Sequence, residues 1–301
     1  MEIPSSTPES GSSDLKHLPS HVPQLPAPKD VLQKGNREVI TDHYFAANVE
    51  KEAKRFRYKV FVRLNAKEIA FKRVSFEHCV FDGCYLNTCV FDTCDFTGCR
   101  FIGSNFHQTA FIGCKFDYAT FERCHIDHDI LRSEAPRAEN LRMRFARSLR
   151  MNYQQVGDAK AVNQAISLEL QATSTYLLKS WSSKESYYQK KFGGWKRFPQ
   201  LVKWADFWIL DFIWGNGESV WNLLRTIMLV LVLVAVYDTA RNGSLLHVDD
   251  ILTALCNAPG EFLGIIPPRN FSPLFLDCIV ASRFVTIALL TAMLVKRFGR
   301  R

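Results

Sequence analysis

A large apolar side chain recurs every five residues through the middle of the chain, beginning at Phe71. The central positions are Phe71, Phe76, Phe81, Leu86, Phe91, Phe96, Phe101, Phe106, Phe111, Phe116, Phe121, Ile126 and Leu131. Two residues before most of them stands a small side chain, often cysteine. A period of five matches neither an α-helix nor a flat strand, so the backbone must turn a corner in every unit.

This order of a small residue, a polar residue, Leu or Phe and two variable positions resembles the pentapeptide-repeat family. The resemblance implies a right-handed quadrilateral β-helix, in which four units make one coil and the central and small residues point inward. Positions twenty apart then stack, which predicts one column of Phe81, Phe101 and Phe121. A second column holds Phe76, Phe96 and Phe116. Thirteen units over residues 71–132 predict about three coils.

The segments before the repeats show other patterns. Residues 1–38 are rich in Ser and Pro without a hydrophobic period, which predicts a disordered tail. Residues 39–70 are interpreted as an N-terminal cap of strand or helix. Within them, residues 55–64 alternate apolar and basic side chains, which is typical of a half-buried strand. Basic and aromatic residues also occur in nucleic-acid interfaces, but a charged outer face equally protects a capping strand, so no nucleic-acid partner is predicted.

Helical spacing replaces the five-residue period after residue 132. It predicts an α-helical hairpin over residues 137–183, with Asp158 as the N-cap of the second helix, and we expect this hairpin to act as a connection. All six tryptophans lie from Trp181 to Trp221, accompanied by lysines and arginines. This composition predicts an interfacial, Trp-rich amphipathic segment over residues 190–218.

Residues 219–301 hold two apolar stretches, at 220–237 and at about 274–295. Eighteen helical residues extend roughly 27 Å, close to the thickness of the hydrocarbon core, so a two-span α-helical transmembrane domain is predicted. Basic residues precede the first stretch and follow the second, whereas the connection is acidic. Both termini are therefore predicted to be cytoplasmic, with the lipid bilayer as a partner. Arg283 and Asp277 within the second stretch could pair with each other, face a lumen or lie near the interface.

The sequence WILDFIWGNGESVW at residues 208–221 resembles a junction motif of bacterial pentapeptide-repeat proteins that carry a two-span module similar to the pore of potassium channels. The residues that carry this resemblance are Asp211, Gly215, Gly217, Glu218 and Trp221. It implies location in the bacterial inner (cytoplasmic) membrane and a homo-oligomer, a tetramer if the module is a channel. It also implies a re-entrant half-helix around residues 248–255 followed by a filter.

The candidate pore loop comprises Thr253, Leu255, Cys256, Asn257 and Gly260. Potassium filters use rings of backbone carbonyls from a glycine-containing loop. Pro259 removes a backbone N–H donor here, and Gly260 alone is free to adopt the left-handed backbone conformation that such a loop needs. A non-standard filter is therefore expected.

Net charge and the positions of the cysteines limit which functions the sequence supports. The charge of +8 fits the basic flanks of a membrane protein, and seven of the nine cysteines occupy the inward repeat position. Four of them, Cys79, Cys84, Cys89 and Cys94, lie on different walls of one predicted coil, which disfavours a zinc site. Residues 124–129, CHIDHD, could suggest a set of metal ligands. The repeat pattern instead places Ile126 in the core and Cys124 at the small inward position, and it places the histidines and aspartates on the surface. We predict no metal, no cofactor and no enzymatic activity.

Three function classes follow. The first is a membrane-anchored scaffold that binds an unknown cytoplasmic protein, and the second is an oligomeric cation channel. The third draws on soluble members of the resembled family that imitate DNA and bind gyrase. DNA mimicry needs a strongly acidic surface, whereas residues 71–131 contain five Lys or Arg against eight Asp or Glu.

Overall fold

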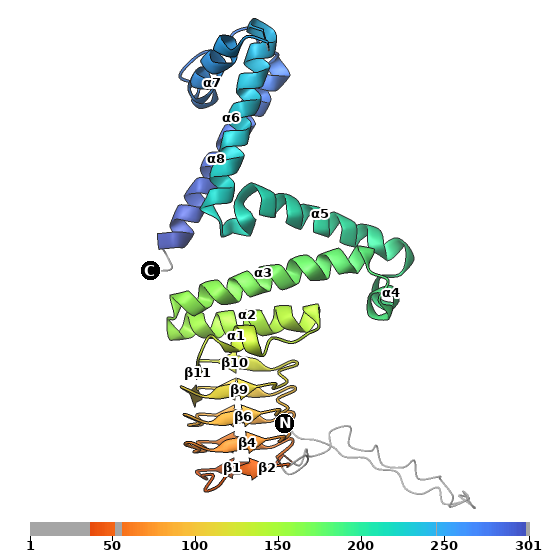
Figure 1. Ribbon diagram of the computed structural model, residues 1–301, viewed down its shortest axis with the longest axis vertical. Coiled ribbons are helices and arrows are strands. Elements are labelled where there is room, and N and C mark those ends of the chain that lie inside the picture. Colours follow the sequence, from red (N-terminus) through yellow and green to blue (C-terminus); the bar gives the residue numbers. More distant parts are fainter. Residues whose placement is uncertain (1–36, 52–55, 245, 299–301) are drawn as a thin grey trace, which may run out of the picture. The chain divides into compact units, whose positions relative to one another are not determined.

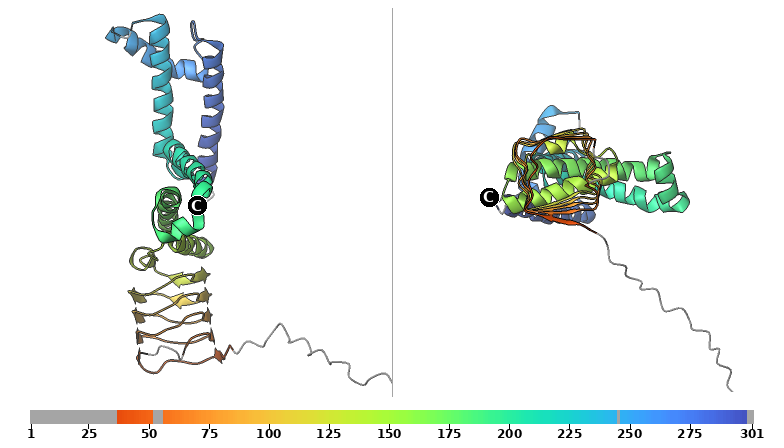
Figure 2. Two further views of the ribbon diagram at one scale, coloured as in Figure 1. Left: turned by 90° about the vertical axis from the view of Figure 1, so that its right-hand side faces the viewer. Right: turned by 90° about the horizontal axis from the view of Figure 1, so that it is seen from below.

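The computed structural model describes residues 37–51, 56–244 and 246–298. The tail predicted at residues 1–38 lies outside the described residues, except for Arg37 and Glu38. Figure 1 shows short parallel strands stacked in coils and followed by helices. Seen from below in Figure 2, the coils outline a quadrilateral. The predicted β-helix is confirmed as a parallel-strand solenoid over residues 39–126.

Two walls of the solenoid carry most of the strands. One sheet contains β1 (Val39–Thr41), β3 (Val60–Val62), β5 (Val80–Asp82), β7 (Arg100–Ile102) and β10 (Thr120–Glu122). Another contains β2 (Val49–Glu50), β4 (Ala70–Lys72), β6 (Val90–Asp92) and β9 (Ala110–Ile112). A third pairs β8 (Asn105–Phe106) with β11 (His125–Ile126). Partners within the repeats are twenty residues apart, as between Phe81 and Phe101.

The solenoid begins earlier than the repeat pattern predicts. Residues 39–70 are not a separate cap: β1 pairs with β3 and β3 pairs with β5, giving about four turns in place of three. Buried Phe56, Phe61 and Ala66 continue the five-residue period upstream, whereas Tyr58 is exposed. The half-buried strand predicted from the alternation over residues 55–64 is therefore wrong, because Tyr58 is exposed and Phe61 is buried. Larger residues stand at the small-residue positions there, which hides the repeat in the sequence.

Stacked phenylalanines fill the interior in the two predicted columns. Ring centroids lie 5.1 Å apart for Phe81 and Phe101 and 5.0 Å apart for Phe101 and Phe121. The second column has 5.3 Å between Phe76 and Phe96 and 5.1 Å between Phe96 and Phe116. Each column places apolar rings in contact over several coils, which removes a large apolar area from water.

Two predicted core residues deviate from the pattern. Phe111 is only partly buried, because β9 is the last strand of its sheet and has no coil beyond it. Leu131 is buried but belongs to a short helix, α1 (Ile130–Ser133), rather than to a thirteenth repeat unit.

A positive φ recurs at the second position after each central residue from Phe71 to Phe121. Four of these corner residues are glycines with φ values from 54° to 69°, namely Gly83, Gly98, Gly103 and Gly113. Non-glycine residues such as Arg73 and Thr93 adopt the same left-handed conformation at equivalent positions. The repeat geometry thus imposes this backbone state even where it costs free energy.

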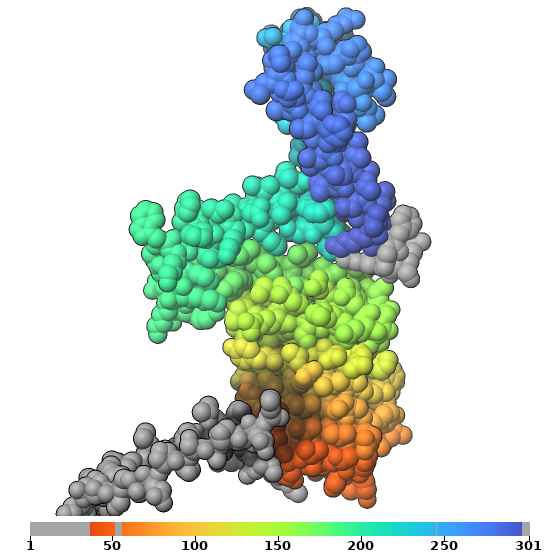
Figure 3. All heavy atoms as spheres, turned by 180° about the vertical axis from the view of Figure 1, so that it is seen from behind, coloured from red at the N-terminus to blue at the C-terminus, as the bar shows by residue number. Residues whose placement is uncertain are grey.

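Helices make up the rest of the chain. They are α2 (Glu139–Val156), α3 (Ala159–Ser182), α4 (Ser186–Phe192), α5 (Arg197–Trp214), α6 (Val220–Asn242), α7 (Val248–Leu263) and α8 (Pro273–Phe298), with short 3-10 turns η1 (Gly194–Lys196) and η2 (Gly215–Gly217). Gly157 ends α2 with a φ of 84°, and the Asp158 side chain accepts a hydrogen bond from Ala161 N at 2.9 Å. This is the predicted N-cap of α3. Helix α2 packs on β10. Seen from behind in Figure 3, the yellow-green residues that follow the repeats lie directly against the yellow residues of the last coils.

Candidate functional site

One wall of the solenoid presents an uncharged column. Tyr44, Asn65, Tyr85 and Asn105 are linked in parallel register between successive coils. Tyr44 is 76% exposed and Tyr85 is 43% exposed. Tyrosine combines a large apolar ring with a polar hydroxyl and is enriched at protein interfaces, so this column, which we call the Tyr–Asn column, is a candidate docking surface.

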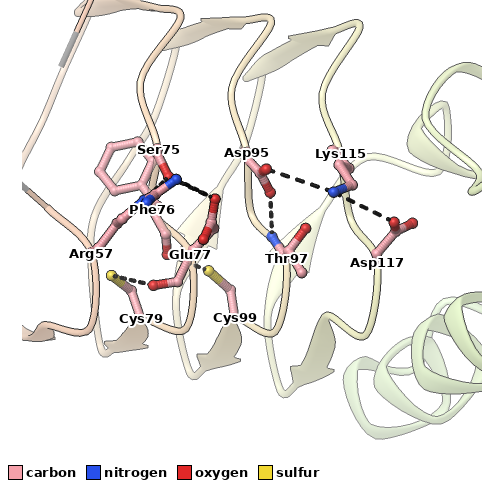
Figure 4. Close-up of polar contacts among 10 residues, drawn as sticks. All are labelled: Arg57, Ser75, Phe76, Glu77, Cys79, Asp95, Thr97, Cys99, Lys115 and Asp117. Carbon is pink, nitrogen blue, oxygen red and sulfur yellow. Dashed lines mark hydrogen bonds and ion pairs between the residues drawn. The ribbon is translucent and has the colours of Figure 1, made fainter. Parts of the chain in front are cut away.

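Another wall carries charges that are mostly paired. Arg57 donates to Ser75 Oγ at 2.9 Å and to Glu77 Oε1 at 2.6 Å, and Figure 4 shows these contacts. Further along the same wall, Lys115 Nζ lies 3.8 Å from Asp95 and 3.7 Å from Asp117. Such exposed pairs contribute little to stability. Their main effect is to neutralise the acidic side chains locally.

The small inward side chains do more than fill space. The Sγ atoms of Cys79, Cys94 and Cys99 donate to the carbonyl oxygens of Phe56, Phe71 and Phe76, each 23 residues earlier, at 2.7, 3.3 and 2.9 Å. Ser104 Oγ makes the same contact with Phe81 O at 3.2 Å. Cysteine, serine and threonine are therefore interchangeable here, because each offers a donor to a backbone carbonyl of the preceding coil.

Burial controls the ionisation of the Cys79 and Cys84 thiols. It raises the pKa of Cys79 and of Cys84 from 9.0 to about 11. Neutral thiols are weak nucleophiles and do not ligate metals. Among the described residues, no group of three or more His, Cys, Asp or Glu is placed to hold a metal ion.

Helix α2 closes the last coil with a polar stripe. Ser148 Oγ accepts from Phe121 N at 2.8 Å, and Gln155 Oε1 accepts from Arg123 N at 3.0 Å. Between them, fully buried Asn152 accepts from Cys124 N at 2.6 Å and donates to Cys124 O at 2.9 Å. The stripe supplies partners that a following strand would otherwise provide. The hairpin is thus a cap as well as the connection that its sequence predicts.

Helix α5 is apolar, yet none of its residues is buried. Phe198, Val202 and Trp208 are each more than half exposed, and Trp195 just before the helix is 94% exposed. Lys196 and Arg197 stand beside Trp195. Aromatic and basic residues together are typical of segments that lie at a membrane surface.

The junction residues form a tight joint between α5 and the next helix. Gly215 caps α5 with a φ of 63°, and Gly217 has a φ of 82°. The carbonyl of Asp211 accepts from Asn222 Nδ2 at 3.0 Å, which ties α5 to α6. Lys296 near the end of α8 forms an ion pair with Glu218 and donates to Gly217 O at 3.0 Å.

Trp221 lies outside this joint. Its side chain is 81% exposed on the first turn of α6. The structure therefore brings together four of the five junction residues, Asp211, Gly215, Gly217 and Glu218, and leaves the tryptophan facing outward.

Two helices, α6 and α8, are long and apolar enough to cross a membrane. Only 17% of the most apolar part of α6 and 11% of that of α8 is buried by the rest of the chain. Large side chains such as Leu233 and Phe284 are more than 60% exposed. This much uncovered apolar surface is unusual for a soluble monomer.

The candidate pore loop is not a loop. Thr253, Leu255, Cys256, Asn257 and Gly260 all lie inside the continuous helix α7, which also contains Pro259. Backbone carbonyls in a helix bond along the helix axis and cannot form a ring around an ion. The buried residues Ala254, Ala258 and Phe262 explain the helix, since their spacing of four places them on one face against α6.

Arg283 has a structural partner. Its Nε donates to Phe262 O at 2.6 Å, at the carboxyl end of α7, and Gly264 follows in the left-handed cap conformation. A cation at this end complements the helix dipole. Arg283 therefore fastens α8 to α7, and its partner is a carbonyl rather than Asp277.

Comparison with known proteins agrees with the geometry of the coils. A family model described as pentapeptide repeats matches residues 71–108 and 89–127, in 8 copies. Residues 71–127 are pentapeptide repeats. The strands before them extend the same solenoid, so residues 39–126 are called the pentapeptide-repeat domain below.

Solved structures of one protein also show similarity. Two trypsin-treated variants of QnrB1, a plasmid-mediated fluoroquinolone resistance protein, match with 14% and 17% identity and TM-scores of 0.18 and 0.13. Each match covers 31% of this chain and 64% or 55% of the other, less than two thirds of its length. No curated protein matches the chain.

Ion pairs between coils place basic groups beside carboxylates of the pentapeptide-repeat domain and offset their negative charge. Arg63 binds Asp42 and Arg73 binds Glu50, with N–O distances of 2.6 and 2.7 Å. Arg100 pairs with Glu122 at 3.3 Å. Because many of its carboxylates have basic partners, the domain lacks the uniform negative field that an imitation of DNA requires.

Proposed function

We propose that this protein is a membrane-anchored, non-enzymatic scaffold whose pentapeptide-repeat domain binds a protein partner at the cytoplasmic face of the bacterial inner membrane. The observation that carries the proposal is the exposure of α6 and α8, whose apolar side chains are left uncovered along most of both helices. A lipid bilayer covers such surfaces without any hydrogen-bonding cost, because a helix satisfies its own backbone groups.

The segment before α6 supports the same arrangement. Exposed Trp195 and Trp208, with Lys196, Arg197 and Lys203 nearby in sequence, suit the headgroup region of a bilayer. The Lys296–Glu218 pair joins the end of α8 to the start of α6, so the basic ends of both spans lie together. By the charge bias of membrane proteins, this end faces the cytoplasm.

A protein partner suits the repeat walls. The Tyr–Asn column offers exposed aromatic side chains on a rigid, hydrogen-bonded framework. A rigid surface loses little conformational entropy on binding, which favours affinity. We therefore assign the partner to this column rather than to the ion-paired wall.

The anchoring is tested on the full chain expressed in a bacterium. We expect the protein to stay in the membrane pellet after alkaline carbonate extraction and to float with lipid in a density gradient. Recovery in the supernatant after extraction would refute the anchor.

Partner binding is tested by photo-crosslinking in cells. A photoreactive phenylalanine analogue at Tyr85 should give a discrete adduct, whereas the analogue at Leu178, which is also exposed but lies on α3, should not. Adducts at neither site, or equally at both, would count against the Tyr–Asn column. Potassium or sodium flux into liposomes that contain the purified protein would refute the scaffold proposal in favour of a channel.

A further inference from the structure

A polar cleft of about 330 Å³ lies where the end of α6 meets α7 and the connection to α8. Its lining includes three carboxylates, those of Asp238, Asp250 and Glu261. Arg269 is the one basic residue among the described side chains that line it. At neutral pH the three carboxylates and the guanidinium carry a formal net charge of minus two.

Glu261 is the unusual member of this set. Its side chain belongs to a residue that is only 6% exposed, and its Oε2 atom has no hydrogen-bond partner among the described residues. Burial raises the pKa of Glu261, and the charge of Asp238 raises it further. A buried carboxylate without a partner is costly, and buried polar atoms in native proteins are nearly always satisfied. Glu261 is therefore the carboxylate of the cleft that would gain most from a cationic partner.

The other two carboxylates are partly satisfied and help to define the site. Asp238 accepts from Asn242 Nδ2 at 2.7 Å, and Asp250 accepts from Ser244 N at 2.9 Å. These hydrogen bonds fix the orientation of the two side chains, of which Asp238 belongs to α6 and Asp250 to α7. Each carboxylate retains lone pairs that can accept from a ligand.

The shape of the cleft distinguishes between kinds of cation. The described residues contain no cluster of three or more His, Cys, Asp or Glu suited to a metal ion, and the volume far exceeds that of a bare ion. Ala254, Ile266 and Pro267 add an apolar wall beside the carboxylates. Carboxylates next to an apolar wall suit a chain of methylene groups that ends in ammonium groups, and a dication matches the net charge.

We propose that this cleft binds an aliphatic diammonium ion, with one ammonium group at Glu261 and the methylene chain along Ile266 and Pro267. The proposal concerns the connection between the two spans and is independent of the scaffold function of the pentapeptide-repeat domain. It assigns a ligand to the part of the chain where the sequence resemblance implies a pore loop.

The first test uses the purified full chain in detergent. Thermal unfolding followed by tryptophan fluorescence should show a saturable rise in Tm with 1,4-diaminobutane, because a ligand that binds only the folded state stabilises it. The neutral analogue 1,4-butanediol, which has the same chain length without charge, should give no rise. Mg²⁺ and Ca²⁺ are titrated in parallel.

The second test removes the charge that the cleft leaves unpaired. Glu261→Gln keeps the side-chain shape and should weaken diamine binding by about tenfold or more, measured by calorimetry. Asp249→Asn removes a carboxylate from the same helix outside the cleft lining and should leave the affinity unchanged.

The proposal would be overturned if the diamine had no saturable effect on Tm, or if the diol had an equal effect. It would also be overturned if Mg²⁺ or Ca²⁺ alone stabilised the protein, or if Asp249→Asn lost as much diamine affinity as Glu261→Gln. If Glu261→Gln does not fold, the comparison of diamine, diol and metal ions on the unaltered chain decides the matter.

Discussion

At the residue scale, the interior of the solenoid combines apolar rings with small hydrogen-bond donors. The Cys99 thiol donates to Phe76 O, while the Phe96 and Phe101 rings stack on those of neighbouring coils. Rings supply the buried apolar area, and the small donors add hydrogen bonds to backbone carbonyls of the preceding coil. The hydrogen bonds from the thiols depend on their neutral form, because a thiolate has no proton to donate.

Alkaline pH should therefore destabilise the pentapeptide-repeat domain. The folded-state pKa of Cys79 and Cys84 is about 11, above the ordinary 9.0 of an unfolded thiol. The stability gained from burying neutral thiols is fully present below pH 9 and is lost as the pH rises toward 11. Melting temperatures followed by circular dichroism should fall across this window. The fall should be smaller after Cys79→Ser with Cys84→Ser, and an identical fall in that variant would contradict the assignment to these thiols.

The corner glycines give a second prediction, since two of them differ only in their surroundings. Gly103 has a φ of 54° and open space around its missing Cβ, so Gly103→Ala should cost about 1–2 kcal/mol of unfolding free energy. A Cβ on Gly98 would lie 2.4 Å from His78 Nδ1, so Gly98→Ala should cost more. Urea unfolding measures both.

The added His78→Ala substitution should relieve the extra loss in Gly98→Ala, as a double-mutant cycle would show. Equal losses in the two single alanine variants would contradict the steric account.

At the scale of elements, α2 acts as the end plate of the solenoid. Ser148, Asn152 and Gln155 lie on one face of the helix and meet the backbone of the last coil. Phe145 on the same helix packs against the Phe116 and Phe121 rings, with centroids 5.8 and 6.0 Å apart. Polar and apolar contacts together close an edge that would otherwise expose unpaired strands.

Removal of the central amide should show how much this closure contributes. Asn152→Ala leaves the buried N–H and C=O of Cys124 without their side-chain partner, which costs roughly 1–3 kcal/mol for each group. Gln154→Ala, an exposed neighbour, should change the free energy of unfolding by less than about 0.5 kcal/mol. Urea titrations followed by far-ultraviolet circular dichroism compare the two. A loss in Asn152→Ala no larger than that of the control would mean that α2 is only a connection.

The sequence predicts the elements to different degrees. The period of five predicts the register of residues 71–126, because a large apolar residue at every fifth position leaves one arrangement that buries nearly all of them. It misses the earlier coils, where Lys59, Leu64 and Ile69 stand at positions that small residues fill later. The polar stripe of α2 is visible in its helical spacing, but its hydrogen-bond partners are backbone groups of another element.

The candidate pore loop fails for a related reason. The resemblance to a pore module implies a loop, whereas the spacing of Ala254, Ala258 and Phe262 favours a helix. Pro259 lies between them without ending α7. Local packing against α6 decides the conformation here, and no pattern around residues 253–260 reveals the cleft beside it.

At the scale of the whole molecule, a hydrogen-bonded solenoid is followed by two helices whose apolar side chains are left mostly uncovered by the rest of the chain. The joint at Gly215 and Gly217 and the Lys296–Glu218 pair connect the spans at their basic ends. Helix α7 lies at the other ends and is fastened to α8 by Arg283. If both spans cross the bilayer, α7 and its exposed Cys256 are on the outer side.

Labelling of Cys256 tests this arrangement most directly. In a Cys278→Ser background, a membrane-impermeant maleimide should label Cys256 in intact spheroplasts, and Cys256→Ser should abolish the label. The buried thiols of the pentapeptide-repeat domain should stay unlabelled until the membrane is opened and the protein unfolded. Labelling of Cys256 only after permeabilisation, or recovery of the chain in the soluble fraction, would contradict a repeat domain held on a bilayer by two spans.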